Sequence, residues 1–528
     1  MAADGSAADG PRISIPRDYN AAADLVDRHR KAGRGAKAAF IDDRATLTYA
    51  QLAERVDRAA NALRALGIEP ESRILLCMLD TIDFPVALLG AIKAGIVPVP
   101  VNTLLTATDY DFMLRDSRAR ALIVSDALYD RLAPVLSQQP ALRHVIVAGS
   151  AVPSGRLGFT PLLDAAEPKA KAAATNCDDI CFWLYSSGST GAPKGAVHLH
   201  SHLMLTAELY AKPVLGIRED DVVYSAAKLF FAYGLGNALT FPLAVGATSL
   251  LLAERPTPAA VARILKDKRP TIFYGVPTLY AALLASDELP KRDATALRRC
   301  ASAGEALPED IGKRWTSHFG IEILDGLGST EMLHIFLSNR PGEVRYGTTG
   351  VAVPGYDIRL IDEAGKPAAD GEIGELQVAG PTSAAFYWNN REKSRDTFLG
   401  PWTRSGDKYR RDTDGYYTYC GRTDDMLKVG GIYVSPFEVE AALMTHESVL
   451  EAAVIGHADE QQLIKPKAFI VLKPGRNAAP GLAEALKDHV KTRLAPFKYP
   501  RWIDFVGELP KTATGKIQRF KLRQRGAA

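Results

Sequence analysis

Apolar strands alternate with helical patterns over residues 48–148, and this alternation constrains the fold more than any other feature. The segment Thr48–Gly67 has a helical period, with Thr48 and Gln51 spaced for a capping box and Gly67 placed to end the helix. A second helical pattern covers Phe84–Gly95. Strands separated by helices predict an α/β fold with parallel strand pairing. The apolar runs that we interpret as buried strands are Arg73–Leu79, Ile96–Val101, Ala121–Val124 and Val145–Ala148.

The composition indicates a chain of several domains with no strong charge. A chain of 528 residues exceeds what one hydrophobic core organises, so two or more domains are expected. The net charge is +3, from 64 basic and 61 acidic residues, and this balance offers no basic surface for nucleic acid. No apolar run reaches the length of a membrane span. We therefore predict neither a nucleic-acid partner nor a membrane partner.

The N-terminus and the cysteines bear on the location of the protein. Residues 1–16 are rich in Ala, Gly and Asp and lack the apolar centre of a secretory signal, so we expect a disordered leader. Five cysteines form no framework, and an odd number without one indicates reduced thiols and a cytoplasmic protein. Cys177 and Cys181 have no second pair at zinc spacing and are expected in the core.

A loop of small residues follows the apolar run Ile180–Leu184, which is long enough for a buried strand. Small residues let backbone N–H groups converge on an anion, hydroxyls add donors, and Lys194 adds a charge. Such composition also occurs in flexible surface loops, but the preceding strand and the following lysine favour a polyphosphate site. It is not a Walker A loop, because Pro193 precedes the lysine and Gly195 follows it. The predicted phosphate-binding residues are Ser186, Ser187, Gly188, Ser189, Thr190, Gly191 and Lys194.

The segment Tyr185–Gly195 resembles the phosphate loop of the adenylate-forming enzymes, which include acyl- and aryl-CoA ligases, peptide-synthetase adenylation domains and luciferases. The resemblance covers nearly the whole chain, with the motifs in the family's order. It implies a large, multi-subdomain N-terminal α/β domain over residues 17–423 that carries the ATP and acid pockets. It also implies a small, mobile C-terminal α+β lid domain over residues 424–528, with a hinge at Asp424.

A second motif, Ile323–Glu331, combines a strand, a glycine-rich turn and a hydroxyl beside a carboxylate. Thr330 can donate to a phosphate oxygen while Glu331 binds Mg²⁺; a helix cap is the alternative for an isolated Ser-Thr-Glu. The resemblance assigns both residues to catalysis. Where the family often has a tyrosine that stacks on adenine, this chain has Leu327. The resemblance also places Gly304, Glu305, Ala306, Asp325, Gly326 and Leu327 around ATP.

Three further sites follow from the resemblance in the last third of the chain. Asp407 would accept hydrogen bonds from the ribose hydroxyls, and Arg422 would donate to ribose or the α-phosphate. Lys516 occupies the position of the catalytic lysine and would also contact ATP. Lys428, Gly430 and Gly431 are similar to the loop that lets the pantetheine arm of coenzyme A pass close to the backbone.

The acid pocket is expected around an aromatic segment, residues 229–236. Phe231 corresponds to an aromatic gate, and aromatic and small residues suit a flat apolar guest. His334 could hydrogen-bond an aromatic carboxylate, narrow the pocket, or be a structural histidine. His198, His200 and His202 could be metal ligands on one strand face, although the resemblance implies no such site. The predicted pocket residues are Phe231, Ala232, Tyr233, Gly326, Gly328, His334 and Ile335.

Together these features predict an ATP-dependent acid–thiol ligase. The resemblance implies ATP, Mg²⁺ and coenzyme A, an acyl-adenylate intermediate, and a role in aromatic compound catabolism. The motifs are most similar to those of benzoate–CoA ligases. A medium-chain fatty acyl–CoA ligase, a carrier-loading aryl-acid adenylation enzyme and a non-enzymatic nucleotide sensor are the alternatives. Residues Pro510–Lys516 also resemble a site that protein acetyltransferases modify, which would remove the charge of Lys516. The sequence leaves the oligomeric state open.

Overall fold

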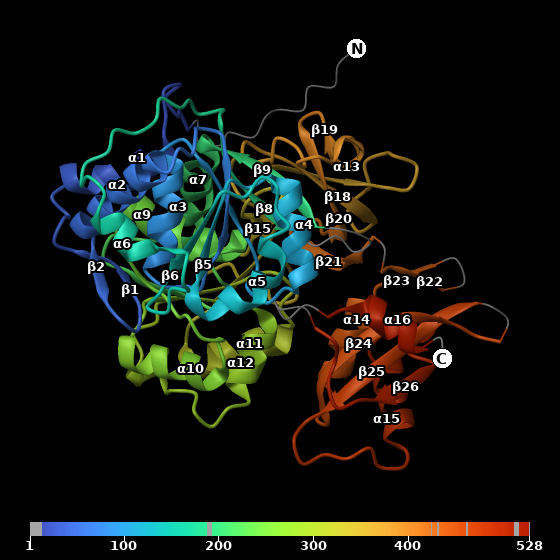
Figure 1. Cartoon of the computed structure of the whole chain (residues 1–528). Helices are drawn as coiled ribbons and strands as arrows, with labels where there is room; N and C mark the ends of the chain where they lie inside the picture. The colour runs from blue at the N-terminus through green and yellow to red at the C-terminus, as the bar shows by residue number, and fades with distance from the viewer. Residues whose placement is uncertain are drawn as a thin grey trace.

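The computed structural model describes residues 13–186, 193–423, 425–429, 432–460, 463–511 and 517–526. It is a mixed α/β structure in which elements β24 to β26 with α14 to α16 form a smaller body beside a larger one (Figure 1). Ile13 and Ile15 pack against the main apolar core, so packing begins before the predicted boundary at residue 17. No helix in the described part of the chain is long and apolar enough to cross a membrane.

The first sheet confirms the predicted parallel pairing. Its order is β4-β3-β5-β6-β7, and β3 pairs in parallel with β4 and β5, as β5 does with β6. Thr48 and Gln51 form the predicted capping box at the start of α2. Gly90 of α3 lets that helix approach α2, because an added Cβ would lie 2.5 Å from Ala59 Cβ. The bounds are α2 Tyr49–Ala65, β3 Arg73–Cys77, α3 Asp83–Lys93, β4 Val97–Pro100, α4 Ala107–Ser117, β5 Ala121–Ser125, α5 Tyr129–Leu136, β6 His144–Ala148, β7 Leu157–Gly158 and α6 Phe159–Asp164.

A nine-stranded sheet forms the centre of the larger body, in the order β16-β15-β14-β13-β12-β10-β11-β1-β2. Its inner strands are parallel, and antiparallel pairs close both edges. Helices α10 to α12 lie on one side of it, away from α1 to α3 (Figure 1). The bounds are α1 Ala21–Lys31, β1 Ala38–Ile41, β2 Thr46–Thr48, β10 Val222–Ser225, β11 Thr248–Leu250, α10 Pro258–Arg263, β12 Ile272–Gly275, α11 Pro277–Leu284, β13 Arg299–Ser302, α12 Glu309–Phe319, β14 Ile323–Gly328, β15 Ile335–Ser338 and β16 Val351–Ala352.

Two antiparallel units complete the larger body. The predicted strand after Asp179 is β8, which forms a hairpin with β9. A five-stranded antiparallel sheet joins this hairpin through a bridge between Ala196 and Tyr387. Three π-helical segments, residues 207–215, 236–240 and 264–268, interrupt the helical regions. The bounds are β8 Ile180–Ser186, β9 Lys194–Leu199, α7 His200–Thr206, α8 Ala232–Leu235, α9 Phe241–Val245, β17 Asp357–Ile361, β18 Ile373–Ala379, α13 Arg391–Thr397, β19 Phe398–Leu399, β20 Trp402–Arg411 and β21 Tyr417–Arg422.

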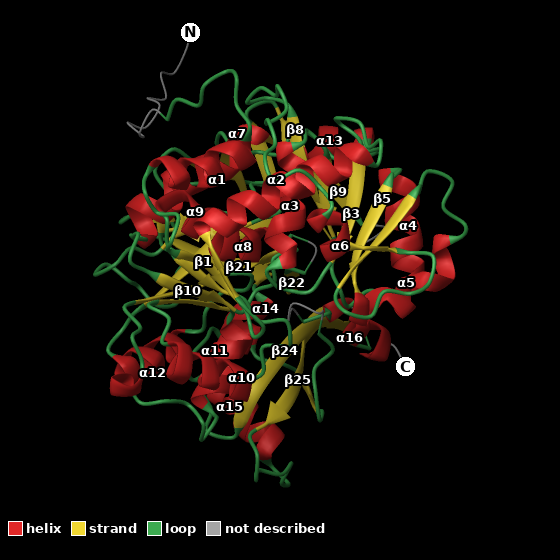
Figure 2. Cartoon of the chain, turned by 60° about the vertical axis from the view of Figure 1, so that its left-hand side comes forward, coloured by secondary structure: helices red, strands yellow, loops and turns green. Residues whose placement is uncertain are grey.

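The smaller body packs α14 and α15 on a three-stranded sheet of β24, β25 and β26, and Figure 2 shows the strands β24 and β25 of this sheet. Its apolar core includes Val439, Val454 and Leu486. Glu440 is buried in it, and Arg519 contacts both carboxylate oxygens of Glu440 at 2.7 Å. The bounds are β22 Leu427–Val429, β23 Ile432–Val434, α14 Pro436–Met444, β24 Val449–Ala458, β25 Ile464–Leu472, α15 Leu482–Lys491, β26 Trp502–Phe505 and α16 Arg519–Gly526.

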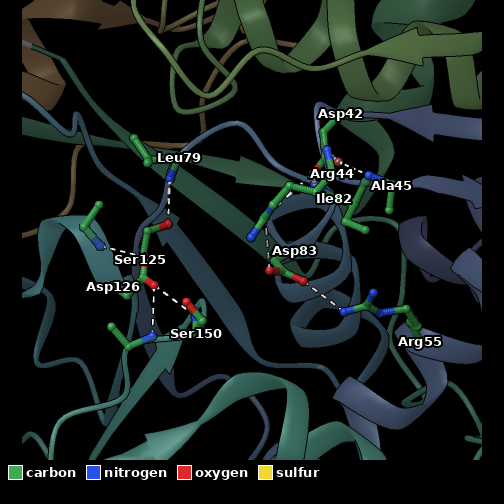
Figure 3. Close-up of polar contacts among 12 residues, drawn as sticks. Asp42, Arg44, Ala45, Arg55, Leu79, Ile82, Asp83, Ser125, Asp126 and Ser150 are labelled. Carbon is green, nitrogen blue, oxygen red and sulfur yellow. Dashed lines mark hydrogen bonds and ion pairs between the residues drawn. The ribbon is translucent and has the colours of Figure 1, made fainter.

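Short carboxylate side chains join the loops at the strand ends (Figure 3). Buried Asp42 accepts hydrogen bonds from the backbone N–H groups of Arg44 (2.9 Å), Ala45 (2.8 Å) and Ile82 (3.1 Å). The first two close the turn between β1 and β2, and the third fixes the residue before α3. Asp42 therefore links the central sheet to the first sheet. Backbone N–H groups that lose a buried acceptor destabilise a fold more than an ordinary hydrogen bond stabilises it.

We predict that Asp42→Ala lowers the free energy of unfolding of the larger body by about 2–3 kcal/mol, because the carboxylate that accepts from three N–H groups is removed. Urea unfolding followed by tryptophan fluorescence measures the change. Asp43→Ala, at the exposed neighbouring position, is the matched control and should leave the midpoint unchanged. Equal midpoints for the two variants would show that the turn does not depend on Asp42.

Candidate active site

Glu331 lies where three separate parts of the chain meet. Its Oε1 accepts a hydrogen bond from Ser186 Oγ at 3.3 Å, at the end of β8. Tyr387, in the loop after β18, donates its hydroxyl to the same oxygen at 2.7 Å. The backbone of Glu331 is fixed as well, since its carbonyl accepts from the N–H of Ala384 at 2.7 Å. The carboxylate is thus held in one orientation beside the hairpin, as a ligand for a hard cation requires.

Lys194 begins β9, directly opposite Ser186 in the hairpin, and supplies positive charge near Glu331. Its Nζ lies 5.0 Å from the centre of the Tyr387 ring, within cation–π range. Burial lowers the pKa of Lys194, and nearby Lys393 and Arg422 act in the same direction, whereas Glu331 raises it. Lys194 acts as a point charge, and an anion that binds beside it would stabilise its protonated form.

The turn that carries Thr330 and Glu331 begins later than the sequence suggests. The prediction that the strand ends before the glycines is wrong, because β14 runs through Gly326, Leu327 and Gly328 and pairs with β15. Both glycines are needed for this pairing. An added Cβ on Gly328 would lie 2.7 Å from the His334 carbonyl oxygen, and one on Gly326 would lie 3.0 Å from Ile335 and Leu337 atoms. The glycines therefore serve sheet packing rather than turn formation.

The next group of predicted nucleotide contacts lies along the ends of β13 and β14. Gly304 has φ +96°, which places Glu305 and Ala306 in a turn before α12. Asp325 is buried and paired in register with Ser302. Its Oδ2 accepts from the N–H of Leu307 at 3.4 Å, and its Oδ1 has no hydrogen-bond partner among the described residues. Burial raises the pKa of Asp325 well above its usual range.

Asp407 and Arg422 face each other on neighbouring strands. They are register partners in β20 and β21, and Arg422 Nη1 lies 3.0 Å from Asp407 Oδ1. Asp407 is 7% exposed, whereas Arg422 reaches solvent. Ser405 Oγ accepts from the N–H of Asp407 at 3.0 Å and fixes its backbone. The pair presents one oriented carboxylate and one guanidinium from the same edge, which suits a polyol beside an anion.

His334 stands at the centre of a buried aromatic cluster. Its ring lies 5.6 Å from that of Tyr233 and 4.5 Å from that of Phe241. Its Nε2 contacts Asn237 Oδ1 at 3.2 Å, and burial lowers the pKa of His334 to about 3. The histidine is therefore neutral at physiological pH. Of the other predicted pocket residues, Ala232 is buried at the start of α8, Phe231 caps that helix, and Ile335 begins β15.

The three histidines at positions 198, 200 and 202 do not form a metal site. His198 lies in β9, whereas His200 and His202 belong to α7, so they do not share a strand face. His200 Nδ1 accepts from the N–H of Ala21, and His198 and His202 contact each other. Within the described residues, no group of three or more histidine, cysteine or acidic side chains could hold a metal ion. All five cysteines are free, and Cys177 is half-buried while the other four are buried.

Comparison with known proteins identifies the family. Residues 27–388 match the AMP-binding enzyme family, and residues 438–516 match the AMP-binding enzyme C-terminal domain. The chain belongs to the AMP-binding enzyme family. It is 62% identical over 515 residues to the benzoate–CoA ligase of Thauera aromatica, covering 97% of each chain. It is 52% identical over 514 residues to the 4-hydroxybenzoate–CoA/benzoate–CoA ligase of Rhodopseudomonas palustris, covering 96% of this chain and 94% of that one.

Solved structures give the same result. The benzoate CoA ligase from Burkholderia xenovorans LB400 has a TM-score of 0.90 at 60% identity, covering 96% of this chain and all of the other. The anthranilate CoA ligase AuaEII in complex with anthranoyl-AMP has a TM-score of 0.94 at 44% identity, covering 97% and 98%. The predicted family and its fold, with a large N-terminal and a small C-terminal domain, are confirmed for this member of the AMP-binding enzymes.

Several predicted residues of this AMP-binding enzyme lie outside the described part of the chain. The structure describes the backbone of Lys428 in β22 but not its side chain. The roles predicted for the residues outside the described part, in phosphate binding, coenzyme A binding, catalysis and hinge motion, stay predictions. These residues are Ser187, Gly188, Ser189, Thr190, Gly191, Asp424, Gly430, Gly431 and Lys516.

Two residues of the site escaped sequence reasoning. Tyr387 is part of an aromatic run, Phe386–Trp388, in a segment without a phosphate or metal motif. Asn237 lies within an apolar segment and is fully buried, and only its contact with His334 reveals a role. The aromatic run was visible in the sequence, but nothing local indicated which ring faces Glu331.

Buried neutral histidines predict a pH dependence of stability for this AMP-binding enzyme. Burial lowers the pKa of His198 and His200 to about 4 and that of His334 to about 3. Below pH 6.5 the unfolded chain binds protons that these folded histidines do not bind, so protons favour unfolding. The free energy of unfolding should fall as the pH drops from 6.5 to 4, by up to about 1.4 kcal/mol per pH unit for each histidine.

Urea unfolding at a series of pH values measures how the free energy of unfolding changes with pH. His334→Asn should make this dependence less steep by the contribution of one histidine. Phe336→Leu, which removes buried volume but no titratable group, is the control and should lower stability at every pH without changing this dependence. A stability that stays constant between pH 6.5 and 4 would contradict the neutral burial of these histidines.

Proposed function

We propose that this chain is an ATP-dependent, AMP-forming aryl-CoA ligase that activates benzoate or a close aromatic acid. The observation that carries this function is the 62% identity to a benzoate–CoA ligase over nearly the whole of both chains. The geometry of Glu331 supports it, because a fixed carboxylate beside the phosphate-loop hairpin is what a phosphoryl reaction needs. The fatty acyl, carrier-loading and nucleotide-sensor alternatives are not favoured.

A carboxylate is a poor electrophile, so the acid is first joined to AMP. The acid oxygen attacks the α-phosphorus of ATP, and the bond to pyrophosphate breaks. We propose that Lys194 and the loop hydroxyls hold the triphosphate, that Thr330 donates to a phosphate oxygen, and that Glu331 would hold Mg²⁺. When bound, Mg²⁺ would neutralise negative charge on the phosphates. The fit rests on the preset orientation of the Glu331 carboxylate, which accepts two hydrogen bonds and keeps further lone pairs free to bind a cation.

The nucleoside fits the described residues in two places. The buried Asp325 Oδ1 without a partner can accept a hydrogen bond from an exocyclic amino group, which would satisfy it. Asp407, oriented by Arg422, can accept from the ribose hydroxyls. Leu327 offers apolar contact rather than stacking. We propose that Gly304, Glu305, Ala306 and Gly326 complete the adenine site through their backbone.

The acyl group is then passed to coenzyme A. The thiol sulfur attacks the acyl-adenylate carbonyl, its proton leaves to solvent or a base, and AMP departs with the acyl–oxygen bond broken. We propose that the Gly430–Gly431 segment, with Lys428, admits the pantetheine arm. Lys516 and this segment would face the site in turn through rotation about Asp424, which separates the two half-reactions.

The residues proposed for the acid pocket suit an aromatic ring. Tyr233, His334 and Ala232 present neutral, flat or small surfaces, and the burial of His334 removes its charge. A neutral wall favours an uncharged ring, whereas a charged substituent would have to be desolvated without a partner. We propose that Phe231, Gly326, Gly328 and Ile335 set the depth of the pocket.

The free thiols of this chain support a cytoplasmic location.

We expect the purified protein to release pyrophosphate and form benzoyl-CoA when given benzoate, ATP, Mg²⁺ and coenzyme A. Pyrophosphate release over a panel of benzoate, hydroxybenzoates, cinnamate and octanoate, with thioester formation followed by chromatography, measures this. Benzoate should have a kcat/KM at least about tenfold above octanoate, since a flat pocket rejects a flexible chain. Octanoate turned over as fast as benzoate, or no AMP from any acid, would overturn the proposal.

We predict that Lys516→Ala slows adenylate formation by about 10³-fold while sparing thioester formation from supplied benzoyl-AMP, because only the first step needs its charge. Lys511→Ala is the matched control, since Lys511 pairs with Glu451. Single-turnover assays of each half-reaction separate the two steps. Protein acetylated at Lys516 should behave like the alanine variant, which tests our proposal that a protein acetyltransferase controls the enzyme.

A further inference from the structure

A buried histidine pair joins the hairpin of the phosphate loop to the turn that carries Thr330 and Glu331. His198 is fully buried in β9, and its Nε2 lies 2.8 Å from the Thr330 carbonyl oxygen. Its Nδ1 lies 3.1 Å from Nδ1 of His202, which is also buried, one turn into α7. The His198 ring stacks on Phe182 of β8, with ring centres 5.4 Å apart.

These contacts determine the tautomers. A carbonyl oxygen only accepts, so the proton of His198 is on Nε2, and its Nδ1 is an acceptor because burial keeps the ring neutral. His202 must then donate from its Nδ1 to His198. The N–H of Leu199 also lies 3.4 Å from His202 Nδ1, but that nitrogen cannot accept while it donates, and the 3.1 Å contact is shorter. His202 thereby holds the proton of His198 on the side that faces Thr330.

The turn needs such a support. Leu333 has φ +66°, a backbone conformation that residues with a side chain rarely adopt, so the turn is held by its surroundings. Within the turn, the Leu333 N–H donates to the Thr330 carbonyl at 3.3 Å and the Met332 N–H donates to Ser329 Oγ at 3.1 Å. From outside the hairpin, the Ala384 N–H donates to the Glu331 carbonyl. His198 joins the hairpin to a backbone atom of the turn, the Thr330 carbonyl oxygen. Ser186 joins the hairpin to a side chain of the turn, the Glu331 carboxylate.

We propose that His198 is a positioning residue for nucleotide activation: its Nε2–H fixes the Thr330 carbonyl, and so positions Thr330 and Glu331 relative to Ser186 and Lys194 of the hairpin. His202 acts through His198 by fixing its tautomer. This inference rests on the proposed function, since it concerns how the same site holds magnesium ATP. Neither histidine touches the nucleotide or the acid in this role. A link between the two halves of the phosphate site should affect triphosphate binding and leave acid binding unaffected.

His198→Leu and His198→Gln separate this role from simple core packing. Leucine removes the shorter hydrogen bond to the Thr330 carbonyl, which then keeps the 3.3 Å bond from the Leu333 N–H, whereas the glutamine amide can place an N–H near the position of Nε2. For His198→Leu we expect magnesium ATP to bind about 10–100-fold more weakly by calorimetry without acid or coenzyme A, because the turn loses the shorter hydrogen bond to its Thr330 carbonyl. The KM for benzoate should stay within about twofold, and His198→Gln should recover most of the affinity.

Two further variants keep the test decisive. His200→Asn changes a buried histidine of the same segment that faces Ala21 of α1, so it should lower thermal stability without changing affinity for magnesium ATP. His202→Leu leaves His198 in place and should weaken magnesium ATP binding by a smaller factor, which tests the pair even if His198→Leu does not fold.

Unchanged affinity in both His198→Leu and His202→Leu, or equal loss in His198→Leu and His198→Gln, would overturn the inference. Failure of the wild-type chain to bind magnesium ATP or to release pyrophosphate would instead refute the proposed function. The two failures are therefore distinguishable.

Discussion

The hydrogen bonds to Glu331 are the interaction on which the rest of the site depends. Ser186 reaches its carboxylate from a hairpin and Tyr387 reaches it from the loop after β18, while its own turn follows β14 of the central sheet. Three units that share no local sequence thus meet at one oxygen. Neutral hydroxyl donors orient the carboxylate without neutralising it, so its charge stays available for a cation. An arginine in either place would form a closed ion pair instead.

Local signals explain which parts of the fold could be predicted. The capping box before α2 needs only a few neighbouring residues, and it occurs as expected. The parallel strands of the first sheet followed from their apolar runs and the helices between them. The predicted end of β14 was wrong because Gly326 and Gly328 look like turn residues in the sequence. The two glycines stay in a strand because β15 packs closely against them, and this contact with a separate segment cannot be read from the local sequence.

The site was predictable to a similar degree and for the same reason. Motif residues such as Thr330 and Glu331 could be predicted because the motif consists of adjacent positions, and their catalytic roles stay predictions. Tyr387, Asn237 and the partners of His198 act through contacts between segments, and a single sequence does not specify those contacts. His198 illustrates this: its spacing suggested a metal ligand on a strand face, whereas the start of α7 at His200 turns the neighbouring histidines elsewhere.

Buried polar atoms without partners indicate how stability and function are balanced in this enzyme. Ser302 Oγ, Asp325 Oδ1 and the Tyr274 hydroxyl all lie near the carboxyl ends of β12 to β14 and lack a hydrogen-bond partner within the described chain. Each such group costs about 1–3 kcal/mol if it stays unpaired. Ligands of open α/β sheets bind at these strand ends. A chain that satisfied every group internally would be more stable, but it would offer nothing for a bound adenylate to complete. In the proposed function, a bound adenylate rather than folding would supply the missing hydrogen bonds.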